Sequence, residues 1–376
     1  MQRQGSLAVF LSTSGHSGVD RVMKNLLPAI AARGIRVDLL HVENHGPYME
    51  EPTANLRVVP LGRSHTFTSL GPLVHYLRTV RPEALLSDKD RVNRVAILAR
   101  KLARVPTRVV VRTGTTVSHD MHKRSAFDRS LHYLSMHYLY RWADAIITPS
   151  AGAAADLAAF ARIASTRISW VPSPVATEQL QAAAREPLDK RWTDAKHRPL
   201  VVGVGELSGR KDFATLVRAF AKLRAQRPAT LLILGEGRER PALTRLCGEL
   251  GIADDVELAG FVANPYPYLA AADLYVHSAR YEGSPVALME AVALGTPVVS
   301  TDCPSGPREI LQDGRYGPLV PVGDDAAMAT AMGAVLDTPP SRNEMRRAAE
   351  PYTLENSTDR YLEILGLAGR ESVQAR

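Results

Sequence analysis

Residues 200–228 read LVVGVGELSGRKDFATLVRAFAKLRAQRP, and this stretch sets the pattern of the whole chain. A β-branched run is followed by a Gly/Ser loop and then by an amphipathic stretch with helical periodicity, which is the order expected in a parallel sheet covered by helices. Residues 7–34, LAVFLSTSGHSGVDRVMKNLLPAIAARG, repeat this order. Two such units predict two doubly wound sheets, each binding its ligand at the carboxyl ends of the strands.

Short apolar runs with strand character continue through both regions. In the first region the predicted strands cover residues 7–11, 37–42, 57–60, 84–87, 108–111, 145–148 and 168–171. In the second region they cover residues 200–204, 230–234, 256–259, 274–277, 297–300 and 318–320. A Pro- and charge-rich stretch over residues 171–199 is interpreted as the linker between the two regions.

We therefore predict an α/β protein of two Rossmann-like domains that face each other across a ligand-binding cleft. The predicted N-terminal domain covers residues 1–175, and a C-terminal helix within 352–376 crosses back onto it. The predicted C-terminal domain covers residues 176–351.

Length and composition narrow the class of protein. A chain of 376 residues is too long for one ordinary domain. No apolar run approaches the roughly 18 residues that span a bilayer, and the N-terminus enters a strand-like run without a signal core. The two cysteines, Cys247 and Cys303, form no CxxC or Cys/His cluster. We expect a cytoplasmic protein without a disulfide framework or structural zinc site.

Charge is distributed unevenly along the chain. Residues 1–190 carry 25 Lys/Arg against 15 Asp/Glu, whereas the remainder carries 21 against 24. This asymmetry indicates that the first domain meets an anionic partner. A cationic surface rich in arginine, without any such partner, is the alternative interpretation.

Residues 281–295, YEGSPVALMEAVALG, form a second informative segment. Ser284 as N-cap, Pro285 at the first helical position and Gly295 at the end predict a short helix. This helix is apolar on every face except at Glu290, so we expect it to be buried, with the carboxylate paired to a group from elsewhere. The vicinal hydroxyls of a ribose would serve; a buried ion pair with a distant arginine is the alternative.

Two loops carry residues suited to a diphosphate. Glu282 and Gly283 precede the predicted helix, where backbone NH groups make an anion site, although Glu282 could equally be a solvated loop carboxylate. Residues 203–211 read GVGELSGRK, a near miss to GxGxxG because a serine replaces the third glycine. Arg210 and Lys211 beside this loop suit a pyrophosphate leaving group; a basic loop in solvent is the alternative.

Further glycine turns follow other predicted strands. LGEG at 234–237 and AGFV at 259–262 would let the backbone approach a base and ribose closely. DCPSGPRE at 302–309 follows another strand and predicts a further helix N-terminus.

Taken in order, these segments resemble the donor-binding half of the retaining glycosyltransferases of family 4, which have the two-Rossmann GT-B fold. The resemblance covers about a third of the chain. It rests on the E-x7-E element formed by Glu282 and Glu290 and on the pieces GELSGRKDFATLVRAFAKL, LILGEGRERPAL, DDVELAGFVANPY, YEGSPVALMEAVALGTPVVSTDCPSGPREIL and YGPLVPVGD.

The resemblance implies roles for particular residues. Glu290 would hold the ribose and Glu282 the hydroxyls of the transferred sugar. Arg210 and Lys211 would grip the diphosphate and take part in catalysis with Glu282. The implied donor-binding set also includes Gly18, Gly205, Gly260, Phe261, Val262, Gly283, Ser284 and Pro285.

The N-terminal half resembles the family less closely. Residues 14–21, SGHSGVDR, are similar to the family's glycine loop that faces the donor. Glu206 stands where many relatives carry an arginine, and RTGTT at 112–116 stands where many place a histidine. The acceptor-side candidates are His16, Arg21, Thr113, His119 and His122.

The sequence points away from a metal cofactor. Asp88-Lys89-Asp90 fits the DxD motif with which other glycosyltransferases bind a divalent ion. No other acidic cluster completes such a site, so a solvated, salt-bridged loop is the preferred interpretation. By the resemblance, the enzyme needs no metal and no cofactor.

The expected reaction is transfer of a hexose or amino sugar, with retention, from a nucleoside diphosphate, preferably UDP. The acceptor would be a hydroxyl of a glycan, a lipid-linked sugar or a small metabolite, and no nucleic-acid partner is expected. Two alternatives stay open: a nicotinamide dehydrogenase that uses the loop at 203–209, and a non-catalytic two-lobed sugar-binding protein.

A last segment bears on the acceptor. Residues 131–142, LHYLSMHYLYRW, place aromatic and apolar side chains at helical spacing just after a basic stretch at 112–129. This combination suits an anionic lipid headgroup or a lipid-linked diphosphate sugar at the inner face of the membrane. The alternative is that the helix packs into the domain core and the arginines are merely solvated.

Overall fold

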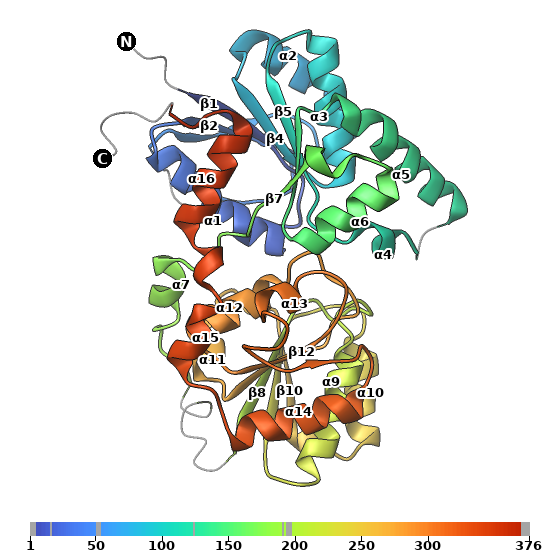
Figure 1. Cartoon of the computed structure of the whole chain (residues 1–376), viewed down its shortest axis with the longest axis vertical. Helices are drawn as coiled ribbons and strands as arrows, with labels where there is room; N and C mark the ends of the chain where they lie inside the picture. Colours follow the sequence, from blue (N-terminus) through green and yellow to red (C-terminus); the bar gives the residue numbers. More distant parts are fainter. Residues whose placement is uncertain are drawn as a thin grey trace. The chain divides into compact units, whose positions relative to one another are not determined.

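The computed structural model describes residues 5–15, 17–49, 54–122, 125–189, 192 and 198–369, and the chain divides into two compact units (Figure 1). Unit 1 comprises Met1–Pro174 together with Thr353–Arg376, and unit 2 comprises Val175–Tyr352. These bounds differ by one residue from the predicted domain bounds.

Unit 1 contains a seven-stranded parallel sheet in the order β3-β2-β1-β4-β5-β6-β7. The strand order reverses between β1 and β4, which is where a doubly wound sheet binds its ligand. The strands are β1 Ser6–Phe10, β2 Arg36–His41, β3 Leu56–Pro60, β4 Ala84–Asp88, β5 Arg108–Arg112, β6 Ala145–Thr148 and β7 Ile168–Trp170.

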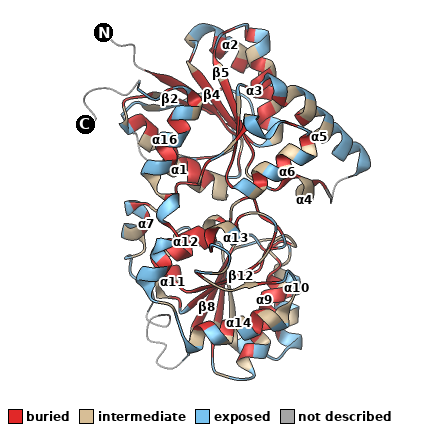
Figure 2. Ribbon diagram, viewed as in Figure 1, coloured by how far each residue is buried: buried red, intermediate tan, exposed pale blue. Residues whose placement is uncertain are grey.

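Helices cover both faces of this sheet, so its inner strands are largely buried, whereas the edge strand β3 is partly exposed (Figure 2). Along β1, Ala8 and Phe10 enter one hydrophobic core, while Leu7 and Val9 enter the core on the other face. The helices of unit 1 are α1 Gly18–Ala32, α2 Leu70–Val80, α3 Asp90–Ala103, α4 Val117–His122, α5 Ala126–Leu139, α6 Ala151–Ala161 and α16 Leu354–Leu365. Short 3₁₀ turns are η1 Phe67–Ser69, η2 Tyr140–Trp142 and η3 Ser165–Arg167.

The C-terminal helix α16 packs beside α1, so segments far apart in the sequence lie side by side in unit 1 (Figure 1). Tyr361, Leu362 and Leu365 are buried in the core on the α1 side of the sheet. The Ser357 hydroxyl donates to the Pro172 carbonyl at 2.8 Å. These contacts fix the helix that the sequence predicts at the C-terminus.

Unit 2 repeats the topology with a six-stranded parallel sheet in the order β10-β9-β8-β11-β12-β13, which reverses between β8 and β11. The strands are β8 Leu200–Val204, β9 Thr230–Leu234, β10 Val256–Gly260, β11 Leu274–His277, β12 Val298–Thr301 and β13 Leu319–Val320. Its helices are α7 Glu178–Ala183, α9 Phe213–Arg224, α10 Arg240–Glu249, α11 Tyr266–Ala271, α12 Val286–Leu294, α13 Pro307–Ile310, α14 Asp325–Asp337 and α15 Arg342–Arg347, with 3₁₀ turns η4 Ala253–Asp255 and η5 Glu350–Tyr352.

All thirteen predicted strands are present, and the prediction of two doubly wound α/β sheets is confirmed. None of the helices that the structure describes is long and apolar enough to cross a lipid bilayer.

Candidate functional site

The end of β11 and the loops that follow β8 and β11 bring four polar side chains together where the strand order of unit 2 reverses. We call these residues the Glu282 cluster: Glu282, Arg210, Lys211 and His277. The two Glu282 carboxylate oxygens lie 2.5 Å from Lys211 Nζ and 2.7 Å from Arg210 Nη1. His277 Nε2 lies 3.7 Å from Glu282 Oε1. One carboxylate is thus held by two cations, beside an imidazole.

Burial and charge set the ionisation of this cluster. Burial raises the pKa of Glu282, but Lys211 and Arg210 outweigh that effect and hold the pKa well below its usual value. Burial lowers the pKa of His277, so its imidazole is mostly neutral at pH 7. Burial also lowers the pKa of Lys211, against the attraction of Glu282. Glu282 is buried and paired, so the alternative of a solvated loop carboxylate is wrong.

Backbone contacts fix the loop that carries the two cations, and both side chains are only partly exposed, so this is not a basic loop in open solvent. Arg280 N donates to the Arg210 carbonyl at 2.8 Å, and the Ser278 hydroxyl donates to the Lys211 carbonyl at 2.8 Å. The Lys211 side chain crosses Gly205, where an added Cβ would lie 3.1 Å from Lys211 Cε. Gly205 therefore makes room for the lysine.

The glycines at 234–237 lie where two loops of unit 2 touch. An added Cβ at Gly235 would lie 1.8 Å from the Gly205 carbonyl oxygen, and one at Gly237 would lie 2.4 Å from the Leu207 carbonyl oxygen. Both glycines therefore make room for a neighbouring loop of the protein. A close approach of their backbone to a nucleoside stays a prediction.

The segment at 260–262 differs from those glycines. Gly260 has a φ of 79°, in the left-handed region that favours glycine. Phe261 exposes 57% of its surface, while Val262 packs against the core of unit 2. An exposed aromatic ring beside a glycine is available to contact a planar ligand.

Glu290 lies in α12, where every residue from Ala287 to Leu294 is buried. The Tyr266 hydroxyl, from α11, donates to Glu290 Oε1 at 3.2 Å. Glu290 thus has a tyrosine hydroxyl among its partners, and its contact with a ribose stays a prediction.

The start of α12 differs from the prediction by one residue. Pro285 is the N-cap and the helix begins at Val286, while the Ser284 hydroxyl donates to Met289 Sδ at 3.7 Å instead of capping. Proline cannot donate a backbone NH, so it takes the cap position here without loss. Gly283 lies buried in the loop before the helix. The helix ends at Gly295, with a φ of 83°, as predicted.

The predicted glycine loop of unit 1 leads into α1. Gly18 is the first residue of that helix, and Ser17 caps it through a reciprocal pair with Asp20. Asp20 accepts from the Ser17 backbone NH at 2.7 Å and also from the Thr13 hydroxyl. Arg21 lies in the first turn of α1, and His16 lies outside the described residues.

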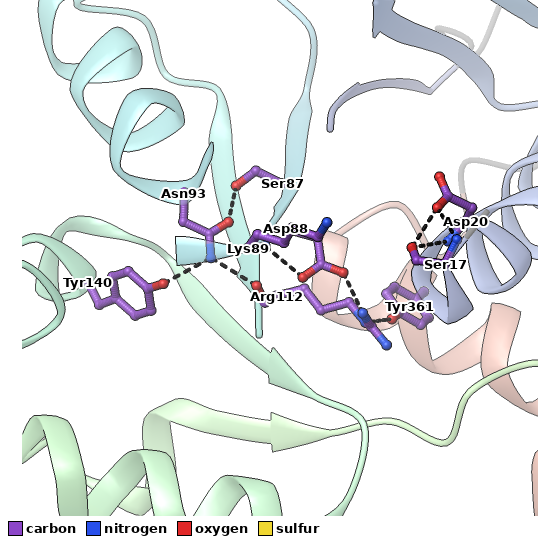
Figure 3. A network of polar contacts seen from close by, with 9 residues as sticks. All are labelled: Ser17, Asp20, Ser87, Asp88, Lys89, Asn93, Arg112, Tyr140 and Tyr361. Carbon is purple, nitrogen blue, oxygen red and sulfur yellow. Dashed lines mark hydrogen bonds and ion pairs between the residues drawn. The ribbon is translucent and has the colours of Figure 1, made fainter. Parts of the chain in front are cut away.

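Asp88 does not form the solvated loop that the sequence suggested (Figure 3). It is fully buried and forms an ion pair with Arg112, whose Nε donates to the Tyr361 hydroxyl at 3.0 Å. Asp90 pairs with Arg94 and lies 2.8 Å from His132 Nδ1. The segment is salt-bridged as expected, but Asp88 is buried, while Lys89 is exposed and Asp90 is partly exposed.

A cavity of about 600 Å³ opens beside these residues at the carboxyl ends of β4 and β5; we call it the unit 1 cavity. Its polar lining includes His45, His65, Lys89, Arg91, Thr113 and His132. The buried Thr113 Oγ1 has no hydrogen-bond partner within the part of the chain that the structure describes. A buried hydroxyl without a partner is costly, so this one is suited to receive a ligand.

The acceptor-side candidates named from the sequence do not all line the unit 1 cavity. Thr113 lines the unit 1 cavity, whereas Arg21 and His119 are not among its lining residues. His122 ends α4, and its side chain lies outside the described part of the chain. Within the described residues, no group of three or more His, Cys, Asp or Glu side chains could hold a metal ion.

Sequence reasoning missed two residues with functional character. His277 is the one polar side chain of the strand LYVH, and its buried Nε2 has no hydrogen-bond partner among the described residues. Lys89 lines the unit 1 cavity with a φ of 73°, a conformation that costs an L-residue about 1–3 kcal/mol. His277 could have been found in the sequence as a polar residue that ends an apolar strand. The unusual backbone conformation of Lys89 has no such sign in the sequence.

Comparison with known proteins places both units in one group. Residues 198–338 match the family described as glycosyl transferases group 1, and residues 17–174 match the glycosyl transferase 4-like domain. An N-acetylgalactosamine-N,N'-diacetylbacillosaminyl-diphospho-undecaprenol 4-alpha-N-acetylgalactosaminyltransferase of Campylobacter jejuni is 27% identical over 92% of this chain and 93% of its own.

Solved structures share the fold at low identity. Anabaena HepE in complex with UDP-glucose superposes with a TM-score of 0.78 at 17% identity, over 96% of this chain and 99% of HepE. WaaG, a glycosyltransferase involved in lipopolysaccharide biosynthesis, gives 0.73 at 16% identity, over 97% of this chain and 99% of WaaG.

Proposed function

Because this chain belongs to the group 1 glycosyltransferases, we propose that it moves a sugar from a UDP-sugar to an acceptor hydroxyl with retention of anomeric configuration. The Glu282 cluster is the observation that carries this proposal. It combines two partly buried cations with a buried carboxylate at the point where a doubly wound sheet binds its ligand.

Arg210 and Lys211 are proposed to hold the diphosphate of the donor. In the protein without a ligand their charges are balanced by Glu282. A diphosphate brings further negative charge, which two cations can share with one carboxylate at hydrogen-bonding distance. Glu282 then directs its remaining acceptor capacity to hydroxyls of the sugar, and Glu290 accepts from the ribose.

The proposed chemistry needs no protein nucleophile. The bond between the anomeric carbon and the β-phosphate oxygen breaks as the acceptor oxygen bonds to the same face of the sugar. The acceptor proton passes to the departing diphosphate oxygen. Negative charge grows on the diphosphate during this step, so fixed cations that face it lower the barrier.

For the donor, we propose a uridine nucleotide that carries a hexose or an amino sugar. HepE was solved with UDP-glucose, and the C. jejuni relative is named for transfer of N-acetylgalactosamine. These two similar proteins support a UDP-sugar whose sugar is a hexose or an N-acetylhexosamine.

The unit 1 cavity is the proposed acceptor site. Lys89, Arg91 and three imidazoles line it together with the carboxylates of Asp88, Asp90 and Asp120. Because Asp88 and Asp90 are paired with Arg112 and Arg94, we propose that Lys89 and Arg91 meet an acceptor that carries negative charge near the reacting hydroxyl. The relative from C. jejuni is named for an acceptor with a diphosphate beside its sugars. A saccharide linked to a diphosphate is therefore the acceptor class that we propose.

Thermal unfolding in the presence of a panel of nucleotides and nucleotide-sugars tests the donor half. Ligands that bind the folded protein raise its melting temperature, so UDP and one UDP-sugar should shift it and NADH should not. The protein with Glu290→Gln is the matched comparison and should lose the shift. A shift with NADH alone would overturn the proposal in favour of a dehydrogenase.

A further inference from the structure

Four large apolar side chains stand out from one face of α5, and we call them the α5 stripe. The exposed fractions are 77% for Phe127, 48% for Leu131, 47% for Leu134 and 57% for Tyr138. Their spacing of four, three and four residues keeps them on one narrow face of a helix. Figure 2 shows α5 largely exposed on the outside of unit 1.

The opposite face of α5 already anchors the helix. Met136 is buried in the core of unit 1, as is Tyr140 in the turn that follows. Packing within unit 1 therefore explains the apolar face of α5 that carries Met136. It does not explain the α5 stripe on the other face. A row of exposed apolar side chains on a monomer marks a surface that meets another apolar phase.

The stripe continues past the end of α5 into a cationic region. Trp142 exposes 44% of its surface, and Lys101 Nζ lies 5.0 Å from the centre of its ring. Arg141 and Arg129 are exposed on the same segment. Residues 123–142 carry four Lys/Arg against one Asp, so the neighbourhood of the stripe is positive.

Exposed apolar side chains beside cations favour an anionic bilayer over a protein as the partner of the α5 stripe. A protein partner requires a matched surface, whereas an anionic bilayer needs only apolar side chains that enter the interface and cations that meet the headgroups. Tryptophan and tyrosine at the border of an apolar row are typical of side chains that sit at headgroup level.

We propose that the α5 stripe, with Trp142 and Lys101, docks unit 1 onto a bilayer that contains anionic phospholipid. On the opposite face of α5, His132 and Met136 line the unit 1 cavity. One helix thus connects the membrane surface to the cavity, which favours an acceptor carried on a membrane lipid. That consequence for the acceptor rests on the proposed function, whereas the docking itself does not.

Flotation of the full chain with liposomes tests the docking. The vesicles are phosphatidylcholine alone, or phosphatidylcholine with an equal share of phosphatidylglycerol, at about 0.05 M and about 0.5 M salt. We expect the protein to float with the anionic vesicles at low salt and to be released at high salt. The variant L131Q/L134Q should lower the bound fraction about tenfold, since it removes apolar contacts with the interface.

Two controls separate docking from other effects. Leu250→Gln makes the same change at an exposed leucine of unit 2 and should leave flotation unchanged. UDP should shift the melting temperature of L131Q/L134Q as it shifts that of the native protein, which distinguishes failed docking from failed donor binding.

Two results would overturn the proposal. One is equal flotation of the native protein and L131Q/L134Q with anionic vesicles. The other is sedimentation that shows a dimer dispersed by L131Q/L134Q, without any vesicle binding, because the stripe would then be an interface between copies of the chain.

Discussion

Glu290 is a carboxylate in the second turn of a buried helix, with the Tyr266 hydroxyl 3.2 Å from one oxygen. We predict that Glu290→Gln weakens UDP binding about tenfold or more, because a charged acceptor for ribose hydroxyls is replaced by a neutral amide. Calorimetry with UDP measures this. Glu249→Gln, at an exposed carboxylate of α10, is the control and should keep native affinity. Unchanged affinity in Glu290→Gln would refute the ribose role.

Lys211 and Arg210 should matter more for turnover than for substrate binding. Charge builds on the diphosphate only as the sugar departs, so we predict that Lys211→Ala lowers kcat about a hundredfold with a smaller change in KM. Steady-state kinetics with the UDP-sugar found by thermal shift separates the two constants. Lys222→Ala, at an exposed lysine paired with Asp325, is the control. An equal loss in KM with kcat intact would assign Lys211 to ground-state binding.

Glu282 should also stabilise the fold in a pH-dependent manner. Its pKa in the folded protein is well below the ordinary value of 4.5, so its stabilising effect is present above about pH 4.5 and is lost as the pH falls toward the folded pKa. We predict that the difference in Tm between the native protein and Glu282→Gln is largest near neutral pH and shrinks below pH 4.5. Thermal scans across this range measure it. A constant difference would show that charge is not the cause.

Glu290 and Asp88 show which properties of a single residue could be predicted from the sequence. The apolar surroundings of Glu290 were enough to predict burial and a partner from another segment. They could not identify Tyr266, because the contact joins α11 to α12 only in the folded chain. Asp88 was misjudged for a similar reason: Arg112 and Tyr361, which bury it, lie far away in the sequence.

Among the secondary-structure elements, the strands were predictable and their loops were not. Alternating β-branched runs fix where a strand lies, so every predicted strand appears with only small shifts at its ends. The helix that carries Glu290 starts at Val286, one residue later than its cap pattern suggested. The packing of Gly235 and Gly237 against another loop was not predicted, since a glycine needed for a ligand and one needed for loop packing look alike in a sequence.

The contact between the loops after β8 and β9 gives a prediction of its own. An added Cβ at Gly235 would meet the Gly205 carbonyl oxygen at 1.8 Å, so Gly235→Ala must displace the loop that carries Arg210 and Lys211. We predict a loss of about 2–4 kcal/mol in stability together with weaker UDP binding. Denaturant unfolding and calorimetry measure the two effects.

Gly248→Ala is the matched control for that loop. Gly248 lies in α10, and an added Cβ there meets no atom within 4 Å. This substitution should be neutral or stabilise the protein by up to about 1 kcal/mol, because alanine is the better helix former. Equal stability of Gly235→Ala and the native protein would show that the two loops can move apart without cost.

For the molecule as a whole, the fold was easier to predict than the acceptor side. Unit 2 carries an ordered series of motifs whose spacing could be compared with a known family. Most of its Glu282 cluster comes from two loops that these motifs identify. Unit 1 builds most of its cavity from the end of β4, the loop after β5, the helices α3, α4 and α5 and the turn at η1, which no local motif connects. Thr113 was named from the sequence, but Lys89 and His132 became candidates only in the structure.

The supply of positive charge by the chain itself leads to the prediction that activity survives chelation. A departing diphosphate needs charge compensation, which a divalent ion provides in many transferases. Here Arg210 and Lys211 can provide it, while Asp88 and Asp90 are already paired with Arg112 and Arg94. We predict that turnover measured with EDTA stays within about twofold of that with magnesium or manganese. Lys211→Ala is the informative comparison, because a variant that lacks one cation should gain from an added metal where the native protein does not. Loss of native activity in EDTA, restored by manganese, would show that an ion and not the two cations compensates the leaving group.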